Sequence, residues 1–222
     1  MPPSSTVENY LKAIHQGQLT LADGIRLVPM GQVATALDVT PGTATTMVKA
    51  LAEDDLVEYE PYSGVRLSAK GERLARRVLR RHRLVELFLV QVIGMKWDEV
   101  HEDAEQLEHV VSDRLIDRID EMLGRPTHDP HGDPIPDSQG AIVHRHFESL
   151  LTCPVSTRLK VTRITDQDPS FLRFIENNDL KPGQPVEVET RDMAADAVVL
   201  KGRDRRLTIG ARAASKLLVE ID

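Results

Sequence analysis

Residues 40–71 read TPGTATTMVKALAEDDLVEYEPYSGVRLSAKG, and this stretch decides the expected fold of the N-terminal part of the chain. Thr40 followed by Pro41 is typical of a helix start, with a capping hydroxyl and a proline in the first turn. A shorter helix is expected over residues 29–37, and a two-residue turn separates it from the helix that starts at Thr40. Two short helices joined in this way predict a helix-turn-helix.

The second half of the same stretch predicts a β-hairpin. Residues 56–60 and 65–67 are short runs of strand-forming type, and residues 61–64 are Pro, Tyr, Ser and Gly, which favour a turn. A hairpin directly after a helix-turn-helix would form a wing. A long helix is then expected over 68–93, ended by Gly94.

Further helices are expected on both sides of this stretch. A first helix starts at Ser5, because Ser5 and Glu8 have the spacing of a capping box. Helices over 98–111 and 112–123 follow the long helix, and the proline-rich and glycine-rich segment HDPHGDPIPD at 128–137 closes the middle region.

From about residue 151 onward, short alternating runs predict a small β-barrel or sandwich. The expected strands are 159–164, 186–190, 197–200, 207–209 and 217–221, with one helix over 170–177.

Composition limits the classes of protein that the chain can be. Its 222 residues are 41% hydrophobic, so it can bury a real core and fits one to three domains. No run approaches the roughly eighteen apolar residues that a bilayer crossing needs, and the N-terminus lacks the pattern of an export signal. We therefore expect a cytoplasmic protein with no membrane association. The single cysteine, Cys153, excludes an intramolecular disulfide framework.

The net charge of −7 conceals a strong segregation of charge. Residues 61–83 hold eight Lys or Arg against one Glu, whereas residues 98–121 hold ten Asp or Glu against two Arg. One face can therefore meet a polyanion such as nucleic acid, and another can meet cations.

The sequence HEDAEQLEH at 101–109 is the most informative about chemistry. On a continuous helix His101, Glu105, Glu108 and His109 fall within roughly 100° of one another, which favours a divalent cation. His82 and Glu86, four residues apart on the preceding helix, can face the same stripe, so that two nearby sites of nitrogen and oxygen ligands are expected. The alternative is a solvated acidic face with a satisfied histidine. A zinc-protease HExxH motif is absent, because residue 105 is Glu.

The helix-turn-helix carries side chains suited to DNA contacts. Thr40, Thr43, Thr46 and Lys49 are expected to meet phosphates and base edges, with Arg66 contributing from the wing. The alternative reading of this region is a helical packing unit.

The chain resembles the diphtheria toxin repressor family of metal-dependent transcription regulators. The resemblance covers most of the chain, and its motifs are specific in order and spacing. They are VENYLKAI at 7–14, the stretch at 40–71, RRHRLVELFL at 80–89, VHEDAEQLEHVVSD at 100–113 and DPHGDPIP at 129–136.

The resemblance implies a mainly α fold with β: a winged-helix DNA-binding domain at 1–73, a helical metal-binding and dimerisation domain at 74–141, a linker at 142–152 and a Src-homology-like or FeoA-like β-barrel at 153–222. It also implies a primary metal site of Asn9, Glu105, Glu108 and His109. An ancillary site would use His82, Glu86 and His101, completed from the barrel by Asp166 in preference to Arg163.

Two positions depart from the family pattern. Iron-type members carry methionine and manganese-type members carry aspartate at the position of Asn9, and Lys12 stands where manganese-type members place a second carboxylate. Glu105 replaces the cysteine of iron-type members, and an all nitrogen and oxygen set of ligands favours Mn²⁺ over Fe²⁺.

The expected function is a homodimeric repressor of metal-uptake genes that is activated by Mn²⁺ or Fe²⁺, with up to two ions per subunit, for binding to a palindromic double-stranded DNA operator. The chain is not expected to be an enzyme. The alternatives are a winged-helix regulator that responds to a small organic ligand and a metallohydrolase that uses Glu102 or Glu105 as its base.

Overall fold

The computed structural model describes residues 3–22, 24–143, 145–202 and 206–222, and the chain forms two compact units. The first unit holds the residues up to His82 together with Glu108–Val111 and Pro136–Ala141, and the second holds the remainder. No described helix is both long enough and apolar enough to cross a membrane.

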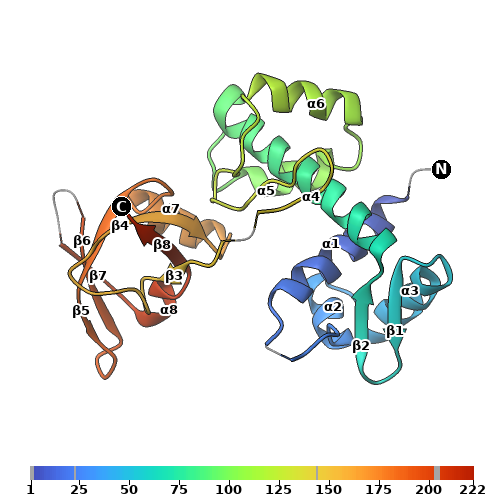
Figure 1. The fold of residues 1–222 in the computed structure, drawn as a ribbon, viewed down its shortest axis with the longest axis horizontal. Helices are drawn as coiled ribbons and strands as arrows, with labels where there is room; N and C mark the ends of the chain where they lie inside the picture. The colour runs from blue at the N-terminus through green and yellow to red at the C-terminus, as the bar shows by residue number, and fades with distance from the viewer. Residues whose placement is uncertain (1–2, 23, 144, 203–205) are drawn as a thin grey trace. The chain divides into compact units, whose positions relative to one another are not determined.

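The first unit contains the predicted winged helix-turn-helix (Figure 1). Thr40 caps the recognition helix, since its hydroxyl accepts from the backbone N–H of Thr43. The two strands pair antiparallel from Val57 opposite Leu67 to Glu60 opposite Gly64, so the predicted wing is confirmed. In order, the elements are α1 (Ser5–Leu19), α2 (Met30–Ala36), α3 (Pro41–Glu53), β1 (Val57–Glu60), β2 (Gly64–Leu67) and the first part of α4 (Ala69–Phe88).

One hydrophobic core joins α1 to the recognition helix. Leu11 and Ile14 of α1 are fully buried in the same cluster as Val48 and Leu51 of α3 and Val65 of the wing. Burying a side chain of this size contributes about 1.5–3 kcal/mol. Helix α1 is therefore an integral part of the winged-helix unit.

The start of α1 differs from the prediction. Its N-cap is Ser4, whose hydroxyl accepts from the backbone N–H of Val7, and Ser5 is the first helical residue. The predicted capping box of Ser5 and Glu8 is therefore wrong. Glu8 is buried, and its carboxylate serves long-range contacts described below.

In the second unit α4 continues to Phe88 and then widens into one π-helical turn, η1 (Leu89–Ile93), which Gly94 ends with a φ of +80°. Two helices follow, α5 (Val100–Leu107) and α6 (Asp113–Met122), the second capped by Ser112. The helix predicted over 98–111 is therefore too long, since residues 108–110 form a turn.

A six-stranded antiparallel sheet forms most of the rest of the second unit, in the order β3-β8-β4-β5-β6-β7. All five predicted strands and the predicted helix are present. A bulge between Val161 and Arg163 shifts the alternation, so that Ile164 is buried and Arg163 is not. The elements are β3 (Glu148–Ser149), β4 (Arg158–Ile164), α7 (Pro169–Asn177), β5 (Pro185–Asp192), β6 (Ala197–Lys201), β7 (Arg206–Ile209), α8 (Ala211–Ala214) and β8 (Leu217–Ile221).

The proline-rich segment between α6 and β3 packs against this sheet. The backbone N–H of Ile164 donates to the carbonyl of His131 at 2.8 Å. Gly132 has a φ of +87°, and a Cβ there would stand 1.9 Å from the carbonyl oxygen of Thr162. Trp97 joins the core cluster of the sheet. The part of the segment that ends at Ile135 is thus a fixed part of the second unit.

Candidate metal centre

Among the described residues of the first unit, Glu108 is the most enclosed acidic group. Its side chain is fully buried, and the Lys12 ammonium lies 2.8 Å from each of its carboxylate oxygens. His82 Nδ1 lies 2.6 Å from Oε2 of the same carboxylate. Burial raises the pKa of Glu108, but the hydrogen bond from His82 and the charges of Lys12 and His82 outweigh it, so that the pKa is lower than usual. Glu108 is therefore an anion held between two cation-forming side chains.

His109 is oriented by a carboxylate on α1. Its Nδ1 lies 2.6 Å from Glu8 Oε2, and Arg81 donates to the other oxygen of Glu8 at 3.2 Å. His109 Nε2 lies 3.4 Å from Glu108 Oε1 and has no hydrogen-bond partner among the described residues. The buried Asn9 Oδ1 also has no hydrogen-bond partner among the described residues. A histidine that donates one ring N–H to a carboxylate presents its other nitrogen as a metal ligand.

Three groups of His, Asp and Glu side chains among the described residues have ligand atoms that all lie within 4.8 Å of one another. They are His82, Glu86 and His101; His82, Glu105 and Glu108; and Glu86, Asp129 and His131.

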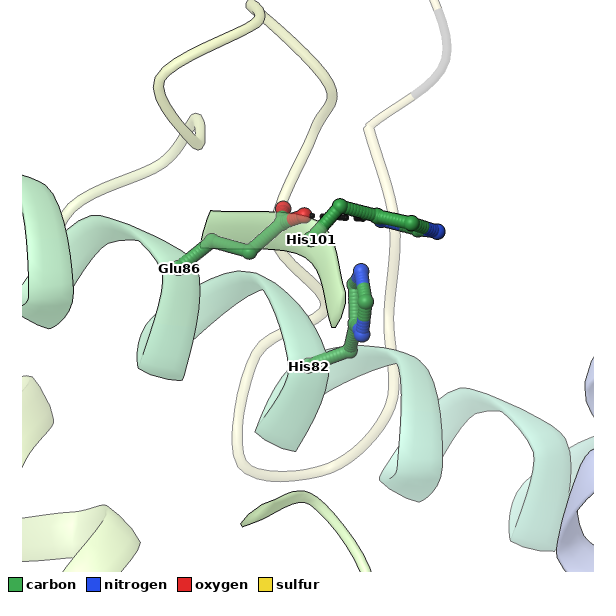
Figure 2. A group of neighbouring side chains, drawn as sticks. All are labelled: His82, Glu86 and His101. Atoms are coloured by element: carbon green, nitrogen blue, oxygen red, sulfur yellow. Dashed lines mark hydrogen bonds and ion pairs between the residues drawn. The ribbon is translucent and has the colours of Figure 1, made fainter. Parts of the chain in front are cut away.

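Figure 2 shows the first of these groups. His82 and Glu86 project from consecutive turns of α4, and His101 comes from α5. Glu86 Oε1 lies 3.1 Å from His101 Nδ1. The Glu86 side chain is fully buried, whereas that of His101 is 45% exposed. Two imidazoles and a carboxylate are a ligand set that first-row divalent metals accept, and the exposed histidine gives an ion a way in from solvent. We refer to His82, Glu86 and His101 as the α4 group.

Two further predicted ligands are Glu105, which belongs to the second of the three groups, and Asp166. Glu105 is on α5 and its carboxylate is 3.6 Å from His101 Nε2. Asp166 is ion-paired with Lys216, and it belongs to none of the three groups found among the described residues. Arg163, which the prediction set aside, is ion-paired with Asp133.

The expected DNA contacts lie on α3 and the wing. Thr43, Thr46 and Lys49 are exposed on α3, as is its cap Thr40. The Thr46 hydroxyl donates back to the carbonyl of Gly42 at 3.0 Å, so its oxygen remains available as an acceptor. Arg66 on β2 is ion-paired with Glu58 across the hairpin, so a phosphate would compete with Glu58 for it.

Known proteins share this architecture in each of its regions. Residues 4–65 match the family described as the N-terminal DNA binding domain of iron dependent repressors, and residues 68–137 match their metal binding and dimerisation domain. Residues 148–221 match the FeoA domain.

The similar proteins cover between about half and nearly all of the chain. The iron-dependent repressor IdeR of Mycobacterium tuberculosis is 29% identical over 211 residues, which is 90% of each chain. The HTH-type transcriptional regulator MntR of Oceanobacillus iheyensis is 34% identical over 121 residues, covering 54% of this chain and 79% of that protein. A solved structure described as a manganese-dependent transcriptional repressor in complex with manganese is 37% identical, with a TM-score of 0.87 and 97% of this chain and 99% of that chain covered.

The chain belongs to the diphtheria toxin repressor family. The resemblance seen in the sequence is confirmed, and so is the expected fold class, with a winged helix, a helical region and a FeoA domain. The chain is a transcriptional regulator of the metal-dependent repressor type.

One set of predicted ligands in this chain has a lysine ammonium beside it. Asn9 Oδ1, Glu108 and His109 Nε2 offer oxygen and nitrogen ligands, but the Lys12 ammonium already compensates Glu108. This donor set fits a divalent ion only in competition with Lys12. The α4 group consists of two imidazoles and one carboxylate whose ligand atoms lie within 4.8 Å of one another, a set that fits a divalent ion.

The sequence analysis named Glu8 only as a capping residue and Lys12 only as a departure from the family pattern, and it missed Asp129 and His131; the structure places all four in or beside these clusters. Glu8 and Lys12 stand four residues apart on α1, so their shared helical face was a usable signal. Asp129 and His131 lie in the segment that the sequence marks only as a loop, where spacing carries no information about which side chains turn inward.

Proposed function

We propose that this chain is a homodimeric, cytoplasmic repressor that binds a palindromic DNA operator when Mn²⁺, or alternatively Fe²⁺, is bound, and that it controls metal-uptake genes. Membership of a family of metal-dependent repressors supports this proposal, as do the exposed threonines and Lys49 of α3. The protein would act by binding DNA and would catalyse no reaction.

The metal would be held by His82, Glu86 and His101. These ligands are nitrogen and oxygen atoms with no thiolate. Such a set favours Mn²⁺ over Fe²⁺, which is the softer ion. The bound ion would supply a fixed positive charge at this point of α4 and α5. A second ion per subunit would use Asn9, Glu108 and His109, with Glu105 nearby on α5, and would have to displace Lys12 from Glu108.

The observation that carries the proposed switch is a continuous set of contacts from α4 to α1. Glu108, an anion, accepts from His82 Nδ1 at 2.6 Å and from Lys12 of α1 at 2.8 Å. With Nδ1 donating to Glu108, Nε2 is the nitrogen that His82 can offer to a metal. A metal ion on His82 would therefore change how Glu108 binds Lys12. Lys12 lies on α1, the helix that packs in the core of the winged-helix unit.

Repression would follow when the two winged-helix units of a dimer bind one operator. The recognition helix α3 enters the major groove, and a dimer fits half-sites about one helical turn apart. Thr40, Thr43, Thr46 and Lys49 would contact phosphates and base edges, and Arg66 would contact the backbone from the wing.

The test compares DNA affinity in Mn²⁺ and in chelator for the wild type and for His101→Ala, using a duplex that the Mn²⁺-loaded wild type selects from a random library. We expect Mn²⁺ to raise wild-type affinity by at least about tenfold and to have little effect on His101→Ala. His146→Ala, a change of another exposed histidine, serves as the control and should respond as the wild type does. A full response of His101→Ala would contradict the proposal.

A further inference from the structure

A groove of about 450 Å³ lies beside the wing in the first unit. Four polar side chains line it: Gln18 of α1, Arg26 of the loop before α2, Glu58 of β1 and Arg66 of β2. None of them belongs to the groups of metal-ligating side chains described above. The charges and hydrogen-bond donors of these four side chains decide what the groove can bind.

Arg66 is held by a carboxylate on the neighbouring strand. Arg66 and Glu58 stand directly opposite each other in the hairpin, and Arg66 Nε donates to Glu58 Oε2 at 2.8 Å. Arg66 Nη2 donates to the same oxygen. The two side chains are 41% and 55% exposed, and an ion pair with this exposure contributes little to stability. The pair can therefore open without unfolding the hairpin.

Arg26 brings a second guanidinium to the groove. It is exposed, and it has no hydrogen bond or ion pair with any other described residue. The lining of the groove therefore holds two guanidinium groups and one carboxylate, which is a net charge of +1. Because arginine stays protonated at any physiological pH, this groove attracts an anion.

The amide of Gln18 adds a donor with a defined orientation. Gln18 Oε1 accepts from the backbone N–H of Leu67 at 2.8 Å. Since a backbone N–H can only donate, the other end of the amide is its NH₂ group. This nitrogen has no hydrogen-bond partner among the described residues, so it can donate to a ligand in the groove.

A phosphate of duplex DNA suits this set of donors. Arginine and glutamine side chains are among the groups that contact DNA phosphates, and one guanidinium can bind two phosphate oxygens at once. The groove lies in the same unit as α3, whose exposed side chains are proposed above to contact DNA. The inference therefore rests on the proposed function for the identity of the polyanion.

We propose that Gln18, Arg26 and Arg66 form a binding site for one DNA phosphate, and that Glu58 competes with the phosphate for Arg66. We call these three residues the wing phosphate site. In the free protein Glu58 occupies Arg66, and in the complex a phosphate replaces it. Exchanging one anion for another yields less free energy than a contact with an unpaired guanidinium. Glu58 therefore lowers the affinity for any duplex, and tight binding depends on the remaining contacts and on metal.

The test measures the affinity of the full chain for DNA by fluorescence anisotropy, in Mn²⁺ and at several salt concentrations. It uses the duplex that the wild type selects and an unrelated duplex of the same length. Glu58→Gln is the main variant, because it removes the charge and keeps the size of the side chain. Glu60→Gln is the matched control, since Glu60 is exposed two residues along the same strand and has no ion pair with a described residue.

We expect Glu58→Gln to bind both duplexes about threefold more tightly, which is the scale of one exposed ion pair. The slope of log affinity against log salt should steepen by about 1, because Arg66 becomes available to a phosphate. Glu60→Gln should give a smaller gain, since it removes only repulsion at a distance. Arg26→Gln should weaken binding to both duplexes and reduce the slope by about 1.

The role of Arg66 is tested in a double-mutant cycle. If Glu58 acts by occupying Arg66, adding Glu58→Gln to Arg66→Gln should give no more than the gain that Glu60→Gln gives. The gain from Glu60→Gln should be the same with and without Arg66. Circular dichroism should show an intact fold in every variant, because all the replaced side chains are at least partly exposed.

Equal gains from Glu58→Gln and Glu60→Gln, or a larger gain from Glu58→Gln that persists without Arg66, would overturn the competition. Unchanged affinity and slope in Arg26→Gln would overturn the wing phosphate site. Either result with DNA binding that still depends on Mn²⁺ would leave the proposed repressor standing. If the expected changes appear but the wild type binds DNA equally in Mn²⁺ and in chelator, the wing phosphate site is sustained and the metal switch is refuted.

Discussion

The ammonium of Lys12 lies 2.8 Å from both carboxylate oxygens of Glu108, and both side chains are buried. An internal cation thus stands at the point where a metal-bound regulator of this family would be expected to compensate negative charge. This pair joins α1 to the turn after α5 without any ion. We therefore expect metal to bind first at the α4 group, and the contact between Glu108 and Lys12 to change only afterwards.

Replacing Lys12 by Met should destabilise the metal-free protein, because it leaves the Glu108 carboxylate buried without its cation. Removing one partner of a buried ion pair costs about 3 kcal/mol or more. Urea unfolding checks this, with Lys49→Met as the control at an exposed position. Added Mn²⁺ should restore more stability to Lys12→Met than it adds to the wild type, and equal gains would contradict the role of Lys12 as an internal cation.

The stability of the metal-free protein should depend on the ionisation of Glu108. Its pKa is lowered in the folded state, so its contribution is complete above the ordinary glutamate value of about 4.3 and is lost as the pH falls through the folded value. The difference in unfolding free energy between the wild type and Glu108→Gln should be large at pH 7 and shrink below about pH 4.3. A constant difference over this range would show that ionisation of Glu108 contributes nothing.

Lys49→Ala should weaken binding to duplex DNA of any sequence. Loss of one phosphate contact reduces the slope of log affinity against log salt by about 1. Fluorescence anisotropy over a range of salt concentrations measures this slope. Lys201→Ala, which removes an exposed lysine from the sheet, should leave it unchanged. An unchanged slope in Lys49→Ala would remove α3 from the DNA interface.

The fold was largely predictable because its signals are local. Thr40 with Pro41 marks the start of α3, and the wing follows from two short runs joined by turn residues. Helix α6 also lies within its predicted range, 112–123, and Ser112 caps it. Each of these features depends on residues within a few positions of one another.

The site was predictable only in part, because its contacts span long distances in sequence. Helical spacing groups His101, Glu105, Glu108 and His109, yet α5 ends at Leu107, and Glu108 turns to Lys12, which lies 96 positions away. Nothing local to Glu108 predicts that preference. The contact between Glu8 and His109 spans 101 positions, and no local signal predicts it either.

Gly132→Ala should destabilise the second unit strongly. A Cβ there would stand 1.9 Å from the carbonyl oxygen of Thr162, in addition to the strain of a positive φ. Gly183→Ala is the control for strain alone, since Gly183 has a φ of +89° and open space around it. Thermal unfolding should show a larger loss for Gly132→Ala, and equal losses would mean that the close approach of the segment to β4 is unimportant.

The account depends most on coupling between metal and DNA, and coupling is reciprocal. The most direct measurement is a Mn²⁺ titration of the full chain by calorimetry, with and without the duplex that it selects. We predict that DNA raises the affinity for Mn²⁺ by the same factor, at least about tenfold, by which Mn²⁺ raises the affinity for DNA. An affinity for Mn²⁺ that is the same with and without DNA would contradict the proposed switch.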